Sequence, residues 1–286
     1  METSALSRFS DDHFTAGFIP LGGVFPTETK GLVGSSQTGL TASMSGHPEN
    51  EIPLIGSLSV VMPAYNEERF IYACLLRVLR EPSVKEIIVV DDASQDSTAS
   101  VVESIVKQYP AVRLERHLHN KGKGAALRTG FALAIGEVVL VQDADLEYDP
   151  IEYEKVLRPI LQGHADVVFG SRFLGGGAHR VHYFWHYVGN KLLTLLSNCF
   201  SGLNLTDMES GMKLFRRDVL ERLDLKESRF SIEPEMVAKV AGLGVRVYEV
   251  PISYYGRSYA EGKKIVWQDG AHAFWAILKY GIGRWL

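Results

Sequence analysis

The chain has 286 residues, 46% hydrophobic and 22% charged, a composition that excludes a fibrous or fully disordered protein. Cys74 and Cys199 are too few for a disulfide framework, and both lie in apolar, helix-like runs, so we expect two buried thiols in a reducing compartment. No apolar run reaches the roughly 18 residues of a membrane span, and no signal-peptide pattern opens the sequence. We therefore expect a cytoplasmic protein.

The net charge of −4 is unevenly distributed. The part from Arg172 to the end contains 16 Lys and Arg and 11 Asp and Glu. The preceding part contains 14 Lys and Arg and 23 Asp and Glu. The acidic part suits a metal ion and the basic part suits phosphates or an anionic surface, although inert solvated faces carry similar excesses. No nucleic-acid partner is expected.

Residues 1–55 are rich in Ser, Thr and Gly and lack periodicity, which predicts a disordered extension before one folded domain over 56–286. That domain begins with a buried strand at 58–63, which Pro63 ends, and continues into an amphipathic helix from about 69 to 80.

A second strand at 86–90 ends in Asp91 and Asp92, and a helix follows it. Ser and Asp residues there can cap the helix, but capping does not explain two adjacent acids at the strand end. A third strand is predicted at 112–116 and an alanine-rich helix at 125–135. The glycines and lysines between them match neither the P-loop nor the Gly-x-Gly-x-x-Gly spacing, so we interpret them as a tight turn into the helix that can also contact a diphosphate.

A fourth strand at 138–142 leads into a dense cluster of acids. Asp143 and Asp145 can converge on one Mg²⁺ or Mn²⁺ if the backbone bends there, leaving positions for phosphate oxygens. The alternative is a solvated acidic turn before a helix at 150–162. A fifth strand is predicted at 166–170.

The alternation of strands and helices predicts an α/β fold with a mostly parallel sheet. Because parallel strands end at one edge, acids that are distant in sequence should meet there in a ligand crevice. These acids are Glu67, Asp92, Asp143 and Asp145.

Several motifs at these strand ends resemble the inverting family 2 glycosyltransferases of the GT-A fold. The motifs are MPAYNEE at 62–68, VVDDASQDST at 89–98, QDAD at 142–145, GSR at 170–172, DMESGMKLF at 207–215 and VPISYYGR at 250–257. Together they are similar to the dolichyl-phosphate mannose synthase branch over about residues 57–265. The resemblance implies a Rossmann-like GT-A domain flanked by helices, ending in a C-terminal amphipathic helix. It also implies transfer of mannose or glucose from GDP-mannose or UDP-glucose to a dolichyl or undecaprenyl phosphate.

The resemblance also implies roles for individual residues. The donor base and ribose are assigned to Pro63, Tyr65, Glu67, Val90 and Asp92. Mg²⁺ or Mn²⁺ is assigned to Asp143, Asp145 and Glu147, with Ala144 in the nucleotide-binding set. The phosphate-binding cations are Arg172, Lys213, Arg257 and Lys263, each of which can instead be a surface residue. A fixed divalent ion suits this reaction because the departing nucleoside diphosphate develops negative charge.

A catalytic base is the least determined part of the predicted site. Transfer to an alcohol needs a carboxylate that takes a proton, and the candidates are Asp207, Glu209, Glu233 and Glu235, with Asp207 and Glu235 placed in the catalytic set. A phosphate acceptor is already anionic and needs no strong base. In that case these acids position the acceptor or form salt bridges.

The segment 179–205 contains aromatic residues followed by a leucine-rich helix. It can lie at a membrane interface near a lipid phosphate, or it can be an ordinary core helix. The stretch 274–286 has the same two interpretations. A zinc site at His182 and His186 is disfavoured because no third ligand accompanies them.

Three functions are compatible with the sequence. The first is a polyprenyl-phosphate glycosyltransferase bound peripherally at the cytoplasmic face of the membrane, and the second is a family 2 glycosyltransferase with a soluble, glycan or protein acceptor. The third is a nucleotidyltransferase or a noncatalytic nucleotide-binding module. A nucleotidyltransferase would carry a Gly-rich basic loop after the first strand, where this chain has AYNEE.

Overall fold

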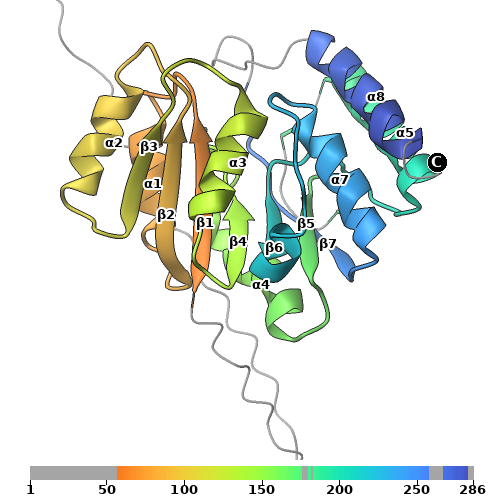
Figure 1. The fold of residues 1–286 in the computed structure, drawn as a ribbon, viewed down its shortest axis with the longest axis horizontal. Helices are drawn as coiled ribbons and strands as arrows, with labels where there is room; N and C mark the ends of the chain where they lie inside the picture. Colours follow the sequence, from red (N-terminus) through yellow and green to blue (C-terminus); the bar gives the residue numbers. More distant parts are fainter. Residues whose placement is uncertain (1–56, 176–179, 182, 258–266, 283–286) are drawn as a thin grey trace, which may run out of the picture. The chain divides into compact units, whose positions relative to one another are not determined.

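A layered α/β arrangement makes up the described part of the chain (Figure 1). The computed structural model describes residues 57–175, 180–181, 183–257 and 267–282. The extension predicted over 1–55 and the predicted phosphate ligand Lys263 lie outside these ranges.

Seven strands of the described residues form one sheet in the order β3-β2-β1-β4-β6-β5-β7. The strands are β1 Leu58–Ala64, β2 Val84–Asp91, β3 Val112–Arg116, β4 Val138–Val141, β5 Val167–Ser171, β6 Lys213–Arg216 and β7 Val247–Pro251. β6 runs antiparallel to β4 and β5, and the other pairs are parallel. The predicted mostly parallel α/β sheet is confirmed. The sequence did not foresee the antiparallel β6, which follows helix α5, Phe184–Ser201, and an irregular loop at 202–212.

The helices cover both faces of the sheet (Figure 1). They are α1 Ile71–Val78, α2 Thr98–Val106, α3 Lys123–Leu133, α4 Tyr153–Leu161, α5 Phe184–Ser201, α6 Arg217–Leu220, α7 Ile232–Leu243 and α8 Trp267–Ile282, with a short 3₁₀ turn at Pro150–Glu152. Alternate strand residues point to opposite faces, so Val60 and Met62 join one core with α1, α2 and α4, while Val61 joins a second core with α3 and α7.

Helices α5, α7 and α8 lie together beside the second core, where α8 contacts both of the others (Figure 1). A Cβ atom on Gly281 of α8 would lie 2.6 Å from Phe200 Cβ of α5, so a larger residue could not keep this close packing. The described residues contain no helix long and apolar enough to cross a membrane. Cys74 is buried as expected, but the same expectation is wrong for Cys199, which lies on the outward side of α5.

Strand β1 pairs with β2 on one side and with β4 on the other, so the order of strands reverses around it. In an open α/β sheet, ligands bind in the crevice beyond the carboxyl ends of strands at such a reversal. The loops after β1 and β4, which contain Glu67 and Asp143 to Glu147, therefore lie where a ligand site is expected.

Candidate active site

The loops after β1, β2 and β4 each contain a non-glycine residue with left-handed backbone. The φ angles are 53° at Asn66, 60° at Ala93 and 62° at Leu146. Such backbone is unfavourable for residues with a Cβ and persists where contacts hold it, often at functional sites. Asn66 provides two of those contacts, because its N–H donates to Ser94 Oγ at 2.9 Å and its Oδ1 accepts from the Gln95 N–H at 2.8 Å.

The guanidinium of Arg257, which follows β7, joins carboxylates from the β1 and β4 loops. Its Nη1 lies 3.2 Å from Glu67 Oε2, and its Nη2 lies 2.7 Å from Asp145 Oδ2. Its Nε and backbone N–H both donate to Glu147 Oε1, at 3.2 and 2.9 Å. The side chains of Asp145 and Glu147 are only 14% and 12% exposed, so this cluster is largely shielded from water.

Asp145 lies in an environment that disfavours its ionised form. Burial raises the pKa of Asp145 to about 8, with Glu147 and Asp143 adding to the rise and Arg257 opposing it. A carboxylate in this position is stabilised by any cation placed between it and its acidic neighbours. The cluster is therefore electrostatically suited to a cation.

Asp143 belongs to a second charged group on the same edge. Lys123 Nζ, at the start of α3, lies 2.9 Å from Asp143 Oδ1 and 3.2 Å from Glu233 Oε1, the latter without hydrogen-bond geometry. The buried Lys213 Nζ lies 2.5 Å from Glu233 Oε2. A Cβ on Gly211 would lie 2.2 Å from Asp143 Oδ2, so the loop before β6 passes directly beside this carboxylate and needs glycine there.

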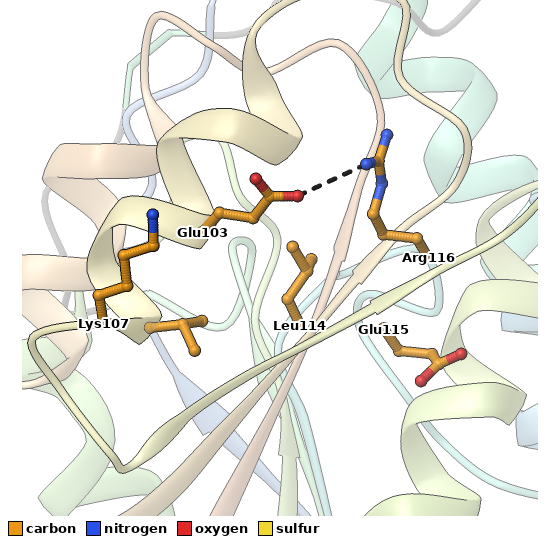
Figure 2. A pocket seen from close by; sticks show the side chains of 6 residues that line it. Glu103, Lys107, Leu114, Glu115 and Arg116 are labelled. Atoms are coloured by element: carbon orange, nitrogen blue, oxygen red, sulfur yellow. Dashed lines mark ion pairs between the residues drawn. The ribbon is translucent and has the colours of Figure 1, made fainter.

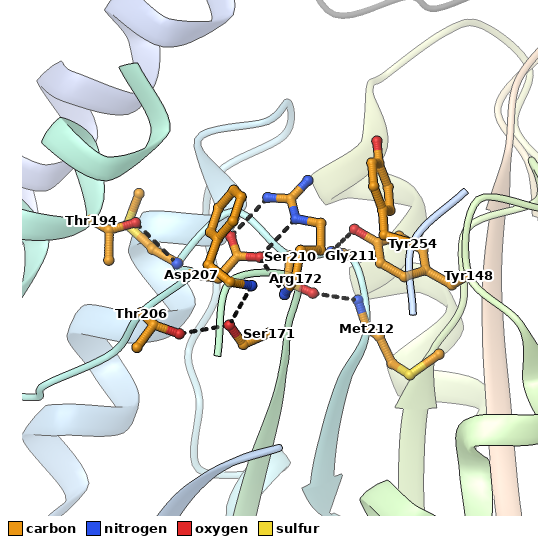
Figure 3. A network of polar contacts seen from close by, with 12 residues as sticks. Tyr148, Ser171, Arg172, Thr194, Thr206, Asp207, Ser210, Gly211, Met212 and Tyr254 are labelled. Atoms are coloured by element: carbon orange, nitrogen blue, oxygen red, sulfur yellow. Dashed lines mark hydrogen bonds and ion pairs between the residues drawn. The ribbon is translucent and has the colours of Figure 1, made fainter. Parts of the chain in front are cut away.

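A third polar group links β5 to the same loop, as Figure 3 shows. Arg172 grips Asp207 with two parallel bonds of 2.7 Å, from Nε to Oδ2 and from Nη2 to Oδ1. Burial alone would raise the pKa of Asp207, but Arg172 outweighs it and lowers that pKa. The Tyr254 ring lies 5.2 Å from the Arg172 guanidinium carbon, and Tyr254 Oη donates to Glu147 Oε2 at 2.8 Å. The loop before β6 is thereby connected to the Arg257 cluster.

Comparisons with known proteins identify the family of this chain. Residues 59–224 match the family model "Glycosyl transferase family 2". The chain belongs to this family. It is 32% identical to the undecaprenyl-phosphate mannosyltransferase of Micrococcus luteus, over 71% of this chain and 85% of that protein. It is 34% identical to the low-salt glycan biosynthesis hexosyltransferase Agl6 of Haloferax volcanii, over 70% of this chain but only 48% of that protein.

Among solved structures, the chain resembles glucosyl-3-phosphoglycerate synthase from Mycobacterium tuberculosis. The TM-score is 0.61 at 20% identity, covering 78% of this chain and 79% of the other, and that crystal contains Mn²⁺, UDP and glucosyl-3-phosphoglycerate. At this identity the likeness establishes the GT-A fold. The chain is thus a family 2 glycosyltransferase, an enzyme that uses a nucleotide-sugar donor.

The residues assigned to the donor base of this glycosyltransferase occupy different environments. Pro63 and Tyr65 are partly exposed at the end of β1. Val90 and Ala144 are 0% and 2% exposed and pack in the two cores, so their side chains do not reach the crevice.

The Asp92 carboxylate accepts hydrogen bonds from the turn before α3. Its Oδ1 lies 2.6 Å from His117 Nδ1 and accepts from the Lys121 N–H at 2.9 Å, and its Oδ2 accepts from the Gly122 N–H at 2.7 Å. Sequence reasoning missed His117, which is a lone histidine without a recognisable motif. Gly122 is required in this turn because its φ is 93° and a Cβ would lie 2.4 Å from Ser228 O.

Two carboxylates predicted as catalytic already accept several hydrogen bonds. Asp207 also accepts the Arg172 backbone N–H at 3.0 Å, in addition to the paired guanidinium. Glu235 on α7 accepts the N–H groups of Lys226 and Glu227 at 2.8 and 2.7 Å and pairs with Lys239 at 2.7 Å. Glu235 thereby holds the 226–228 loop that packs against Gly122. These contacts favour structural roles for both acids.

Glu209 differs from those two acids because its Oε1 is buried and accepts no hydrogen bond from the described residues. Burial, followed by Glu233, raises the pKa of Glu209 to about 7. Glu209 therefore combines an oxygen without a hydrogen bond and a pKa near neutrality, and among the candidate bases Glu233 Oε1 also accepts no hydrogen bond, although Lys123 lies 3.2 Å from it. Lys213, predicted to bind phosphate, is instead enclosed with Glu233 and the Ser210 carbonyl.

An open pocket of about 580 Å³ lies between α2 and β3 (Figure 2). It is lined by charged residues of both signs, including Glu103 and Arg116, which lie 3.5 Å apart. It contains none of the residues at the ends of β1 and β4, so we do not assign the chemistry to it.

Proposed function

We propose that this glycosyltransferase moves a hexose, mannose or glucose, with inversion from a nucleotide diphosphate sugar to a polyprenyl phosphate. The relative from Micrococcus luteus and the dolichol-phosphate mannosyltransferase of Pyrococcus furiosus, at 30% identity, support this assignment. We further propose that the enzyme works at the cytoplasmic face of a membrane, to which it binds reversibly.

On the donor side, Asp143, Asp145 and Glu147 are the residues that would hold Mg²⁺ or Mn²⁺. Their carboxylates are the hard oxygen ligands that these ions prefer, and a cation, Arg257, already lies between two of them. Among the described residues, no three His, Cys, Asp or Glu side chains are already arranged to hold a metal ion. Side chains must therefore shift when the ion binds. When bound, the ion supplies Lewis-acid stabilisation of the departing nucleoside diphosphate.

The chain's own cations complete the donor side. Arg257 offers a fork that fits two phosphate oxygens, and Lys123 orients Asp143 through their ion pair at 2.9 Å. Arg172 donates hydrogen bonds from Nε and Nη2 to Asp207. Its Nη1 is therefore the group that a phosphate at the end of β5 would contact.

The observation that carries the acceptor assignment is the apolar surface that α5 exposes. Its fully buried positions are Thr194, Ser197 and Ser201, whereas several large apolar residues face outward. The exposed fractions are 67% for Phe184, 78% for Trp185, 65% for Leu192 and 60% for Leu195. Leu193, Leu196 and Phe200 on the other side of α5 pack against the second core, but a helix enclosed in a core would not expose four large apolar side chains. This pattern suits a helix that lies in a membrane interface.

This apolar surface begins beside the cations of the site. The Phe173 ring lies 5.4 Å from the Arg172 guanidinium carbon and 5.3 Å from the Tyr187 ring of α5. Helix α8 extends the surface with Phe274 and Trp275, which are 48% and 68% exposed. A lipid chain along α5 would thus place its phosphate near Arg172.

A second candidate acceptor is a soluble alcohol, and the buried, unpartnered Glu209 Oε1 favours it. An alcohol must lose a proton during transfer, and a carboxyl with a pKa near 7 suits a general base. A phosphate acceptor does not need this group.

A donor panel tests the proposed function. Nucleoside diphosphate release is measured from GDP-mannose, UDP-glucose and related sugars with Mn²⁺, with and without a short polyprenyl phosphate. We expect one donor to dominate and release to rise on addition of the lipid phosphate. Equal release with glycerol or a free sugar as acceptor would favour the soluble alternative and a role for Glu209.

A further inference from the structure

We propose that Arg257 is an internal counter-cation of the metal site, which a divalent ion displaces and which then binds the donor diphosphate. This exchange makes binding of the metal and of the nucleoside diphosphate cooperative. The inference rests on the proposed donor site and adds an order of events to it.

Arg257 and a metal ion compete for the same oxygens. The guanidinium approaches Asp145 Oδ2 to 2.7 Å and Glu147 Oε1 to 3.2 Å. Mg²⁺ binds carboxylate oxygens at about 2.0–2.1 Å. An ion at that distance from these two oxygens would occupy the space of the guanidinium, and two cations in a largely buried cluster repel each other. Arg257 therefore has to move when Asp145 and Glu147 coordinate an ion.

The three carboxylates of the cluster are unfavourable when no cation lies beside them. Glu67, Asp145 and Glu147 are brought together by loops that internal hydrogen bonds hold in place. Without Arg257 or an ion, three acids would face each other with little water between them, since each side chain is at most 14% exposed. In the metal-free protein Arg257 offsets part of the negative charge of this cluster.

The displaced guanidinium needs a new anionic partner. A nucleoside diphosphate supplies one, because its oxygens match the guanidinium fork and it binds the same metal ion. The Phe70 ring, 5.1 Å from the Arg257 guanidinium carbon, offers a face along which the side chain can move without losing all its contacts. Metal binding alone breaks the Arg257 ion pairs, whereas binding with the diphosphate replaces them.

Mn²⁺ binding, measured by calorimetry or by the electron paramagnetic resonance of free Mn²⁺, tests the exchange without reference to turnover. For the full chain we expect Mn²⁺ to bind at least about tenfold more tightly when GDP or UDP is present. Arg257→Gln should bind Mn²⁺ alone about tenfold more tightly than the unmodified protein and lose most of the enhancement by the diphosphate. Arg257→Lys, which keeps the charge without the fork, should lie between them and serves if Arg257→Gln does not fold.

Arg246→Gln is the matched control. Arg246 also pairs with a carboxylate through two nitrogens, at 3.0 and 2.6 Å from Asp166, but on the exposed surface. It should leave Mn²⁺ binding unchanged.

Asp145→Asn separates the two possible failures. If Asp145→Asn weakens Mn²⁺ binding but both Arg257 variants bind Mn²⁺ no more tightly than the unmodified protein, the exchange is wrong and the metal site stands. If Asp145→Asn leaves Mn²⁺ binding unchanged, the proposed metal site is wrong, and the exchange with it.

Discussion

The two sides of the crevice differ in the side chains that they bury and expose. The donor side, formed by the loops after β1 and β4 with Arg257, buries charge: three carboxylates share one guanidinium at 2.7 to 3.2 Å. The proposed acceptor side, formed by α5 and α8, exposes apolar surface, with Trp185 78% and Trp275 68% exposed. Buried charge and exposed large apolar patches are each costly in a soluble protein. The proposed function accounts for both features, because a metal ion with a diphosphate would occupy one side and a lipid chain would cover the other.

The difference also concerns rigidity. The donor loops are fixed by backbone and side-chain hydrogen bonds, such as Glu67 N–H to Thr98 Oγ1 at 2.8 Å. The outward residues of α5, such as Trp185 and Leu192, are largely exposed and would gain contacts from a partner. Changes on the donor side should therefore affect chemistry and folding, whereas changes on the acceptor side should affect lipid use alone.

The largest effect should come from the donor carboxylates. Asp145→Asn keeps the shape of the side chain but removes a charge from the proposed metal site, so sugar transfer should fall by at least about a hundredfold. Nucleoside diphosphate release in Mn²⁺ measures this loss, and circular dichroism should show a folded protein. Glu154→Gln, on an exposed surface pair, is the control. Undiminished turnover, or full activity in chelator, would remove the metal from the account.

A large change in stability is expected at the junction of the two sides. Lys213→Met removes the hydrogen-bonded partner of the buried Glu233 and leaves it only the Lys123 contact at 3.2 Å, which should cost about 3–5 kcal/mol in the free energy of unfolding. Lys213→Met with Glu233→Gln should recover part of this loss. Lys279→Met breaks the exposed pair with Glu227 and should cost no more than about 1 kcal/mol. Urea denaturation gives all three values, and equal losses at both lysines would contradict the importance of burial.

Asp92→Asn should weaken donor binding roughly ten- to a hundredfold, because a mispaired buried polar group costs about 1–3 kcal/mol. The geometry adds a second readout: the variant disturbs the turn held at His117 and Gly122, so its thermal midpoint should also fall. An unchanged donor isotherm with a lower midpoint would mean that Asp92 holds this turn and takes no part in donor recognition.

On the acceptor side, replacing Trp185 and Leu192 with Ser should weaken binding to anionic vesicles about tenfold or more, since each exposed side chain loses apolar contact with the lipid. Turnover with the lipid acceptor should fall accordingly, while donor hydrolysis should remain. Sedimentation with vesicles at rising salt measures the binding, which should weaken as charge is screened. Equal losses of donor hydrolysis would show that the two sides are not separable.

A pH dependence of stability is expected at Glu209. Because burial raises its folded pKa from 4.5 to about 7, Glu209 stabilises the protein below pH 4.5 relative to Gln, and this contribution is lost as pH rises to about 7. The stability of the unmodified protein relative to Glu209→Gln should therefore fall across this window, by roughly 1 kcal/mol per pH unit, and stay constant above it. Denaturation at pH 5, 6, 7 and 8 checks the trend, and a flat difference would contradict a raised pKa.

The sequence predicted the parts of this molecule that depend on local pattern. Buried apolar runs followed by acids located β1, β2 and β4 and the edge where Glu67 and Asp145 meet. It could not predict that Arg257, 190 residues after Glu67, would join these acids, because this contact depends on how β7 enters the sheet.

The sequence also could not predict the direction in which side chains point. Val90 and Ala144 lie within recognisable motifs, but strand alternation and the bend after β4 turn both into the core. The leucine-rich pattern of α5 was compatible with either a core or an interface, and only the tertiary arrangement showed that Thr194 and Ser197 face inward. Pattern fixes where groups occur along the chain, whereas packing decides which of them are accessible.

The central claim is most directly tested by identifying the product. Incubation with the preferred donor, Mn²⁺ and a short polyprenyl phosphate, followed by mass spectrometry and nuclear magnetic resonance of the anomeric proton, gives both the acceptor and the stereochemistry. We predict a polyprenyl phosphoryl hexose whose anomeric configuration is opposite to that of the donor. A product with retained configuration, or sugar found on a water-soluble acceptor and absent from the lipid phosphate, would contradict the account.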